Sequence, residues 1–433
     1  ITKHVANILK NLYSDTNIIY LHANLSSNYR EKNELFKYRE LNDYHHAHDA
    51  YLACTLGIYQ KYYLTKSTNF DKLKELNKYL YNKQKYSELK YGYVINSIDN
   101  ELSTFDEKTG EIIFDANYFN ATVKNTLYQN DILISRKTEI KTDRFYKETI
   151  YKKNDKKAKF SLKENLKPCI YGGYNETNYS YMKLIEYQKE GKNINALIGI
   201  PVLLEKSKNK DIAIDNYIKE SFSIDDYIVK KERLPFNLLI EYKKHNCLIT
   251  GCGISSAELV NAEEFTLSKK EQIKYKYLLN YIFNNKYPNK EKYLKQNNLN
   301  DMNHIDYKEL CNKVFNTQIN DLFELIIEHI KTDYPLYNSI YEKLNLVKES
   351  NEFNNLPLEI SNDEARKGSI SKVLIIKQLF IMLKCNPTNA NLEKLNKTVK
   401  FNNRVGRING VNVITATIVN KSITGLKERK YEF

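Results

Sequence analysis

The chain has 433 residues, of which 42% are hydrophobic and 28% charged, and its formal net charge is +14 at pH 7. This balance is that of a globular protein, and it excludes wholesale disorder as well as collagen-like and mucin-like chains. The longest apolar stretch, residues 373–383, is much shorter than the ~20 residues that cross a bilayer, so we expect a soluble chain with no membrane partner.

Helical spacing of apolar residues dominates the first part of the chain. It predicts helices over 3–13 and 43–63. Between them, residues 17–25 are rich in Ile, Leu and Tyr, a composition typical of a strand. The Lys-, Asn- and Tyr-rich segment 65–93 is predicted to be a polar helical excursion. Gly110 then separates two short β-type runs and predicts a hairpin, because glycine readily adopts the positive φ of such turns.

Patterns typical of strands become frequent after residue 130. Residues 132–150 predict interrupted strands, the basic run 152–159 predicts a loop, and Tyr171-Gly-Gly-Tyr174 predicts a turn. Short β-type runs alternate with polar turns as far as residue 256, and β character returns over 398–426. In between, apolar periodicity predicts four helices. They span residues 269–285, 319–331, 337–348 and 362–383.

The six cysteines show no CxxC pair and no recurring spacing. A chain of this length does not need disulfides, and the two cysteines closest in sequence lack the partners of a zinc site. We therefore expect free thiols in a reducing compartment. The cysteines are Cys54, Cys169, Cys247, Cys252, Cys311 and Cys385.

The positive charge is unevenly distributed along the chain. Lys, Asn, Tyr and Ile are abundant and Trp is absent, which indicates AT-rich codons. Such codons add Lys wherever the surface tolerates it, but they do not add Arg, of which only nine are present. Each Arg is therefore more readily explained by bidentate or stacked recognition. Residues 131–170 carry a net charge of +6 and residues 371–433 a net charge of +9, while the other segments together are close to neutral. A charge concentrated in this way suits an anionic partner such as nucleic acid.

One run concentrates side chains that bind metals or transfer protons. Residues 42–51 read NDYHHAHDAY and contain three of the eight histidines and two acids. On a helix, His46 and Asp49 share one face, as do His45 and His48. An imidazole beside a carboxylate can hold a divalent ion, or the carboxylate can hold it while the imidazole takes a proton. One Asp supplies too few oxygen ligands for a hard ion such as Mg²⁺, and histidines that merely cap the helix or face solvent are the alternative interpretation.

The stretch from Tyr29-Arg30 to Leu52 resembles the third segment of the split RuvC nuclease domain in type II CRISPR effectors, the RNA-guided DNA endonucleases. Shorter matches continue along the chain in the same order. They are ITKHV at residues 1–5, KTGEI at 108–112, KTE at 137–139, YGG at 171–173 and KSITGL at 421–426. The resemblance therefore spans nearly the whole chain.

The resemblance implies an α+β fold in two parts. Residues 1–130 would form an incomplete RNase H-like (RuvC) α/β portion, the third segment of the split domain. Residues 131–433 would form a mixed β-rich wedge and PAM-interacting region with inserted helices. Within that region, about 171–255 would be the β-rich first half, and about 256–433 the helical insertion with a terminal β-hairpin.

For the first portion, the resemblance implies a two-metal nuclease site of which this chain holds only a part. In the family, RuvC cuts the non-target DNA strand with two Mg²⁺ ions, for which Mn²⁺ can substitute. Their ligands are an Asp and a Glu from the first two segments and a His and an Asp from the third. The last two fall on His46 and Asp49. We therefore expect a C-terminal piece that does not cleave DNA by itself.

The same resemblance implies the partners and the location. The partners are a guide RNA (crRNA with tracrRNA), target double-stranded DNA and the N-terminal part of the same protein. That part holds the first two RuvC segments, the recognition lobe and the HNH nuclease, which cuts the target strand. The implied location is the bacterial cytoplasm.

The resemblance also implies a phosphate-binding loop in the wedge. In the family, a short loop grips the target-strand phosphate next to the PAM through backbone N–H groups and a Lys. Residues 145–149 match it, with Lys147, Glu148 and Thr149 as the phosphate-binding residues. Backbone amides combined with a cation are suited to a phosphate. An ordinary polar turn is the alternative interpretation of this segment.

PAM reading is implied for residues 402–409. Well-known members of the family use two Arg on a hairpin, each bidentate to a guanine in the major groove. Arg404 takes the first position, and either Gly406 or, with a gap of one residue, Arg407 takes the second. Because the spacing departs from the guanine–guanine pattern, we expect a different PAM, in which Asn402, Asn403 or Asn409 reads an adenine.

The residues alone leave other functions open. The chain could be a stand-alone basic nucleic-acid-binding accessory module in which the histidine cluster is structural. An independent metallohydrolase is disfavoured, because the run His46-Ala-His48-Asp49 has no spacer before the Asp and no His after it, unlike an H-x-H-x-D-H loop.

Overall fold

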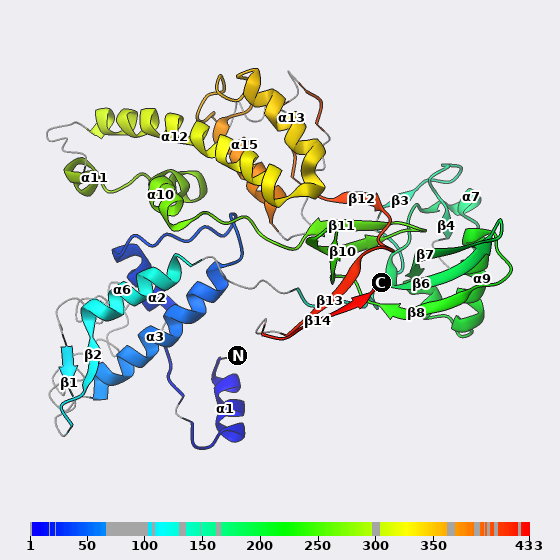
Figure 1. The fold of residues 1–433 in the computed structure, drawn as a ribbon, viewed down its shortest axis with the longest axis horizontal. Helices are drawn as coiled ribbons and strands as arrows, with labels where there is room; N and C mark the ends of the chain where they lie inside the picture. Colours follow the sequence, from blue (N-terminus) through cyan, green and yellow to red (C-terminus); the bar gives the residue numbers. More distant parts are fainter. Residues whose placement is uncertain are drawn as a thin grey trace. The chain divides into compact units, whose positions relative to one another are not determined.

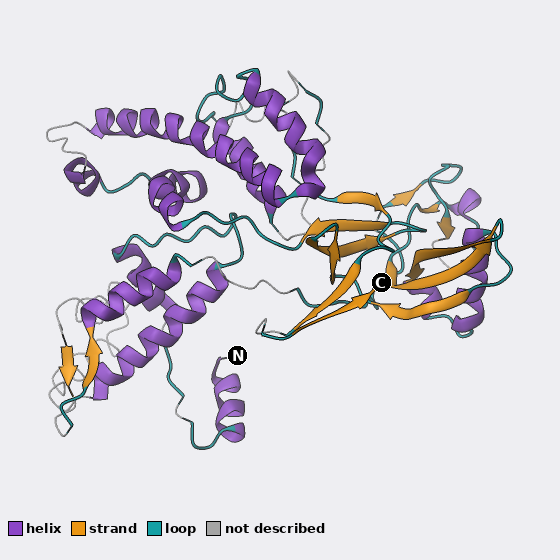
Figure 2. Cartoon of the chain, viewed as in Figure 1, coloured by secondary structure: helices purple, strands orange, loops and turns teal. Residues whose placement is uncertain are grey.

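The chain folds as two compact units in the computed structural model (Figure 1). The first unit consists of Ile1–Ile132 with Thr266–Lys308, and the second of Leu133–Phe265 with Glu309–Phe433. Among the described residues, strands gather mainly in the second unit (Figure 2). The structure describes residues 2–16, 18–21, 23–65, 103–105, 109–129, 136–147, 149–161, 166–296, 304–361, 369–384, 390–393, 395, 399–401, 406–422 and 426–433.

The core of the first unit lies between helices α2 (Ala23–Lys32), α3 (His45–Thr65) and α6 (Ala116–Leu127). Each helix contributes an apolar stripe to one buried cluster. The cluster includes Leu25, Tyr29, Leu52, Leu56, Val123 and Leu127. Tyr29 also donates a hydrogen bond to Asn120 Oδ1 (2.8 Å), which joins α2 to α6. Helices α10 (Lys269–Asn284) and α11 (Lys290–Gln296) belong to the same unit.

Several predicted elements of the first unit are confirmed. Helices α1 (Thr2–Leu12) and α3 form where the apolar spacing predicts them. The hairpin of β1 (Ser103–Phe105) and β2 (Ile112–Asp115) also forms, with Gly110 at φ 70°. The helical excursion predicted over 65–93 lies, except for Thr65, outside the described residues.

The strand predicted over 17–25 is wrong. Residues 18–21 are irregular and α2 begins at Ala23. Ile19 and Tyr20 remain 38% and 53% exposed. A strand is stable only beside another strand, and within the described residues none pairs with this segment.

Antiparallel sheets form the strand-rich part of the second unit. Among the described residues they are a six-stranded sheet of order β12-β11-β10-β9-β13-β14, a three-stranded sheet β7-β6-β8 and a small sheet β3-β5-β4. The strands are β3 Ile150–Tyr151, β4 Phe160–Ser161, β5 Gly173–Tyr174, β6 Tyr179–Lys189, β7 Lys192–Pro201, β8 Ile228–Leu234, β9 Leu238–Tyr242, β10 His245–Cys252, β11 Ala257–Asn261, β12 Ile408–Val411, β13 Thr417–Lys421 and β14 Glu428–Glu432. Over the described residues 136–147 and 149–150, the predicted strands are wrong apart from isolated bridges at Glu139 and Tyr146 and the start of β3, and residues 132–135 and 148 lie outside the described ranges.

Strand β6 is buried on both of its faces. One face packs against α9 (Lys210–Phe222), and the opposite face packs in a core shared with the six-stranded sheet. The first core includes Tyr181, Ile185, Ile214 and Ile218. The second includes Met182, Leu184, Ile240 and Ile249. Helix α9 was not predicted, because it lies in the region where only β-type runs and polar turns were expected.

Two adjacent glycines allow the small sheet to close. Gly172 has φ 79°, and a Cβ there would lie 2.3 Å from the carbonyl oxygen of Tyr151. A Cβ on Gly173 would lie 2.1 Å from the carbonyl oxygen of Phe160. Strand β5 therefore fits between β3 and β4 only because neither residue carries a side chain. The turn predicted over Tyr171–Tyr174 reduces to Gly172, because Tyr171 ends the short helix α7 (Pro168–Tyr171) and Gly173–Tyr174 form β5.

The remaining helices pack around aromatic side chains. They are α8 (Val202–Glu205), α12 (His304–Asp333), η2 (Pro335–Tyr337), α13 (Asn338–Glu349) and α15 (Lys372–Leu383). The rings of Phe323 and Phe353 stack with centroids 3.9 Å apart, and the buried Lys372 donates to Asn316 Oδ1 (2.7 Å). The helices predicted after residue 256 are confirmed with two changes of bounds: α12 begins earlier, and α15 begins only at Lys372, since residues 369–371 are irregular and 362–368 lie outside the described ranges. No described helix has the length and apolarity needed to cross a bilayer.

Helix α10 begins with a capping box. The Ser268 hydroxyl accepts from the Glu271 amide (3.4 Å), and the Glu271 carboxylate accepts from the Ser268 amide (2.7 Å). We expect Ser268→Ala to lower the free energy of unfolding of the first unit by ~1 kcal/mol, measured by chemical denaturation. The exposed Lys270 of the same helix provides the control, since Lys270→Ala should stay within ~0.5 kcal/mol of the wild type. Equal losses in both variants would contradict the capping role.

Candidate functional site

Helix α3 carries the histidine-rich run, and local hydrogen bonds fix its first turn. Asn42 Oδ1 accepts from the Tyr44 amide (3.3 Å), and the Asn42 carbonyl accepts from His45 Nδ1 (2.8 Å). Since a carbonyl oxygen only accepts, His45 carries a proton on Nδ1. The His46 amide donates to the Asp43 carbonyl (3.1 Å). These bonds start the helix at the first histidine of the run and set the direction of the side chains that follow.

The three histidines of the run differ in exposure. His45 is only 8% exposed, His48 is half-buried and His46 is exposed. The rings of His45 and His46 lie 4.1 Å apart. Burial, and next the charge of Arg30, lower the pKa of His48 to about 4, so His48 is neutral at pH 7. His46 is therefore the histidine of this run that is most open to a ligand from solvent.

Asp49 lies one turn after His46, and two cations bind its carboxylate. Arg30 of α2 approaches it to 3.1 Å, and Lys37 donates a hydrogen bond to it. Arg30 is almost fully buried, whereas 37% of the Asp49 side chain is exposed. Burial raises the pKa of Asp49, but the hydrogen bond from Lys37 and the charges of Arg30 and Lys37 outweigh burial and hold the pKa below its ordinary value. Asp49 is therefore a carboxylate at neutral pH.

The side chains of His46 and Asp49 could supply part of the coordination shell of a metal ion. His46 offers one ring nitrogen and Asp49 one carboxylate, whereas Mg²⁺ prefers several oxygen ligands. Over the part of the chain that the structure describes, no group of three or more His, Cys, Asp or Glu side chains comes together as a metal site. In this chain the charge of Asp49 is balanced by Arg30 and Lys37 instead.

The second unit contains an open groove with a volume of about 600 Å³. Its walls come from the segment before β3, from the β10–β11 turn and from β12. Four cationic side chains and two acidic ones line it, so the groove has a positive balance that suits a phosphate-bearing ligand. They are Lys141, Lys147, Lys159 and Arg407, with Glu176 and Glu258.

Arg407 immediately precedes β12 and is held by neighbouring strands. Its NH1 lies 3.1 Å from Glu258 Oε1 on β11, and the Thr250 hydroxyl on β10 donates to the same oxygen (2.7 Å). The Nε atom of Arg407 is buried without a hydrogen-bond partner. Gly406 has no side chain that could contact a base, and its carbonyl accepts a hydrogen bond from the buried Tyr337 hydroxyl (3.0 Å). Of the two residues considered for the second PAM-reading position, Arg407 is thus the one that lines the groove.

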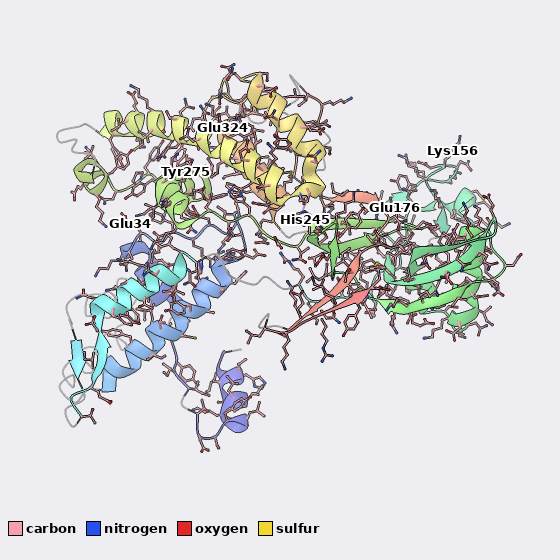
Figure 3. All side chains as sticks on the ribbon, viewed as in Figure 1. Glu34, Lys156, Glu176, His245, Tyr275 and Glu324 are labelled. Carbon is pink, nitrogen blue, oxygen red and sulfur yellow. The ribbon has the colours of Figure 1, made fainter. Side chains whose placement is uncertain are left out.

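The other predicted DNA-binding residues are only partly described. Glu148 and Arg404 lie outside the described residues, and Thr149 is exposed. Lys147 Nζ forms an ion pair with the carboxylate of Glu176 (Glu176 is labelled in Figure 3). The Lys147 amide donates a hydrogen bond to the Glu176 carbonyl (3.1 Å). The Lys147 amide is therefore already used, and its ammonium group would have to exchange Glu176 for a phosphate. Both side chains are more than half exposed, so this pair is weak.

The partners of these site residues were not predicted from the sequence. Arg30 and Lys37 at Asp49, and Glu258 at Arg407, are brought in by tertiary packing. The scarcity of arginine was the available signal for Arg30. No comparable signal exists for Glu258, which is 149 residues from Arg407 in the sequence.

Comparisons with known proteins match two domain models to successive parts of the chain. The family model described as the Cas9 RuvC domain matches residues 1–139, and the model described as the PAM-interacting domain of CRISPR-associated endonuclease Cas9 matches residues 142–429. The chain belongs to the Cas9 family. Similar curated proteins are the CRISPR-associated endonucleases Cas9 of Listeria innocua serovar 6a (31% identical over 240 residues) and of Streptococcus mutans serotype c (30% over 239 residues). Each alignment covers 49% of this chain and 17% of the relative's length.

Membership of the Cas9 family confirms the resemblance seen in the histidine-rich run and in the later motifs. The Cas9 RuvC match contains helices α1, α2, α3 and α6 with His46 and Asp49, and the PAM-interacting match contains the larger sheets with Arg407. The α+β class is confirmed as well. Helices α10 and α11 fall in the PAM-interacting match, yet they fold with the first unit.

The described cysteines are free thiols, as predicted, and Cys385 lies outside the described residues. Cys252 lines the groove, and burial raises its pKa to about 12, whereas Cys54 is exposed. Because the thiolate is the nucleophile, we expect alkylation of Cys252 at pH 8 to be at least ~100-fold slower than that of Cys54. Mass spectrometry of the labelled peptides measures both rates, with the buried Cys247 as a second slow thiol. Equal labelling of Cys252 and Cys54 in the folded chain would contradict the burial of this groove wall.

Proposed function

We propose that this chain is the part of an RNA-guided DNA endonuclease that supplies half of the RuvC metal site together with the PAM-reading surface. The observation that carries the proposal is that each matched domain holds a suitable side chain. An ionised Asp49 beside the exposed His46 lies in the RuvC match, and Arg407 lies in a cation-lined groove of the PAM-interacting match. Since the alignments cover 17% of the relatives' length, cleavage of DNA by the whole protein is part of the proposal.

In an RNase H-like RuvC domain, His46 and Asp49 would hold Mg²⁺, or Mn²⁺ in its place, together with carboxylates from segments outside this chain. An ion bound there lowers the pKa of a water molecule and stabilises charge on the cleaved phosphate of the non-target strand. Asp49 contributes a full negative charge because its pKa is low. His46 contributes a ring nitrogen, which can also take a proton from water. The chain alone is proposed to be inactive, because one His and one Asp supply too few ligands.

PAM reading is proposed for the groove of the second unit. The guanidinium of Arg407 has the fork of donors that fits N7 and O6 of a guanine in the major groove. Glu258 fixes the orientation of that guanidinium. Arg404 is proposed for the first reading position, and Asn409, which lines the same groove, has the amide that suits an adenine.

A phosphate contact is proposed beside the PAM-reading residues, formed by Lys147, Glu148 and Thr149. It would position the duplex without reading its sequence, because a phosphate is the same for every base. The proposed partners are therefore target double-stranded DNA, a guide RNA of the crRNA–tracrRNA kind and the segments that complete the protein: the first two RuvC segments, the recognition lobe and HNH. The proposed location is the bacterial cytoplasm.

Asp49 provides the test of the nuclease assignment. In the protein that includes the completing segments, Asp49→Ala should reduce cutting of the non-target strand at least ~100-fold. Loss of even an outer-shell partner of a metal lowers metal affinity or activity about 10–100-fold. Cutting of the target strand in the same reaction should persist. Asp15→Ala, which removes an exposed carboxylate elsewhere in the first unit, should change neither rate. Loss of both cuts in Asp49→Ala, or DNA cleavage by the 433-residue chain alone, would contradict the proposal.

Arg407 provides the test of PAM reading. A cleavage library with a randomised PAM should show that Arg407→Ala relaxes the preference at one position, where a bidentate Arg is worth ~1–3 kcal/mol of discrimination. Arg404→Ala should relax a different position. Lys147→Ala is the control, because loss of a phosphate contact should weaken binding equally for all sequences and lower the salt slope by about one contact. An unchanged PAM consensus in both Arg variants would contradict the assignment.

A further inference from the structure

The segment 33–38 links α2 to the run before α3 and ends next to Asp49. Its backbone turns sharply at Glu34, which has φ 52°. The Leu35 amide donates to the Arg30 carbonyl (2.8 Å), and Arg30 NH1 donates to the Leu35 carbonyl (3.4 Å). Lys37 in the same segment binds the Asp49 carboxylate. Both cations that hold Asp49 thus depend on the conformation of this short segment.

Helices α10 and α11 bind this segment from the other side. The Glu34 carboxylate, labelled in Figure 3, accepts from Lys276 Nζ and from the Tyr277 hydroxyl (3.2 Å) of α10. Lys292 of α11 lies 3.7 Å from the same carboxylate. The Tyr38 hydroxyl donates to the Lys276 carbonyl (2.8 Å). The segment is therefore held at Glu34 by both helices and at Tyr38 by α10.

The pair of Glu34 and Lys276 is sheltered from water. Their side chains are only 16% and 21% exposed. Burial raises the pKa of Glu34, but the hydrogen bond and charge of Lys276, then Lys292 and Tyr277, outweigh burial and lower it. A charge in such a place must stay paired, because an unpaired partner would be left with little solvation. The pair is thus a fixed connection, unlike the exposed pair of Lys147 and Glu176.

We propose that α10 and α11 form a brace for the nuclease half-site, and that Glu34, Lys276 and Tyr38 are positioning residues that act on Asp49 through Arg30 and Lys37. The brace belongs to the PAM-interacting match in sequence and to the first unit in structure. A displacement of α10 would shift Lys37 and change the charge around Asp49. The consequence for DNA cleavage rests on the proposed function, whereas the brace itself does not.

Hydrogen exchange of the 433-residue chain tests the brace directly. In Glu34→Gln and in Lys276→Met, we expect the amides of segment 33–38 to exchange about tenfold faster or more, because each change removes a hydrogen bond to a charged group. The double variant should be no faster than the faster single variant, since the two residues act as one unit. Lys270→Met, which removes an exposed charge from the same helix, should leave the segment unchanged. Unchanged exchange in both single variants, or an equal rise in α6, would overturn the proposal.

Metal dependence of the completed protein tests what the brace does for Asp49. Glu34→Gln should raise the Mg²⁺ concentration for half-maximal cutting of the non-target strand about three- to tenfold, while target-strand cutting in the same reaction stays constant. A lower rate with the same Mg²⁺ dependence would overturn the positioning role. If Asp49→Ala leaves non-target cutting intact, the proposed function fails while the exchange experiment still decides whether the brace exists.

Discussion

The negative charge of Asp49 is the constraint on which the arrangement of the first unit depends. A carboxylate that is more than half buried is costly unless it is paired, and here Arg30 and Lys37 supply the pairing. Arg30 is itself buried in α2, one residue after Tyr29 of the core cluster. Packing α2 on α3 through this cluster therefore brings the cation to the carboxylate.

The same physical arrangement recurs in the groove of the second unit. Arg407 is held by Glu258, as Asp49 is held by Arg30, and each pair is partly sheltered from water. A residue kept in this way has its orientation fixed before a ligand arrives, so less conformational entropy is lost on binding. The pair of Lys147 and Glu176 differs, since both side chains are more than half exposed and water weakens their attraction.

Local patterns predicted those elements whose signal lies within a short window of sequence. The apolar spacing of α3, α10 and α13 and the glycine of the β1–β2 hairpin lie within short windows of sequence, so they could be recognised there. The strand expected over 17–25 failed because β-type composition does not supply a pairing partner. Helix α9 was missed because it lies between strands, although Ile214, Ile218 and Phe222 recur at helical spacing and pack in the core with β6.

The sequence by itself determined the family, the histidine-rich helix and the placing of the positive charge in two short stretches. It also placed His46 and Asp49 one turn apart, because helix geometry fixes the spacing of residues three positions apart. Only the tertiary structure decided which cations hold Asp49, that Arg407 rather than Gly406 lines the groove, and that α10 folds with the first unit. These are contacts between residues far apart in the chain, as with Glu34 and Lys276 or Glu258 and Arg407. They follow from how buried surfaces fit together and leave no periodic trace in the sequence.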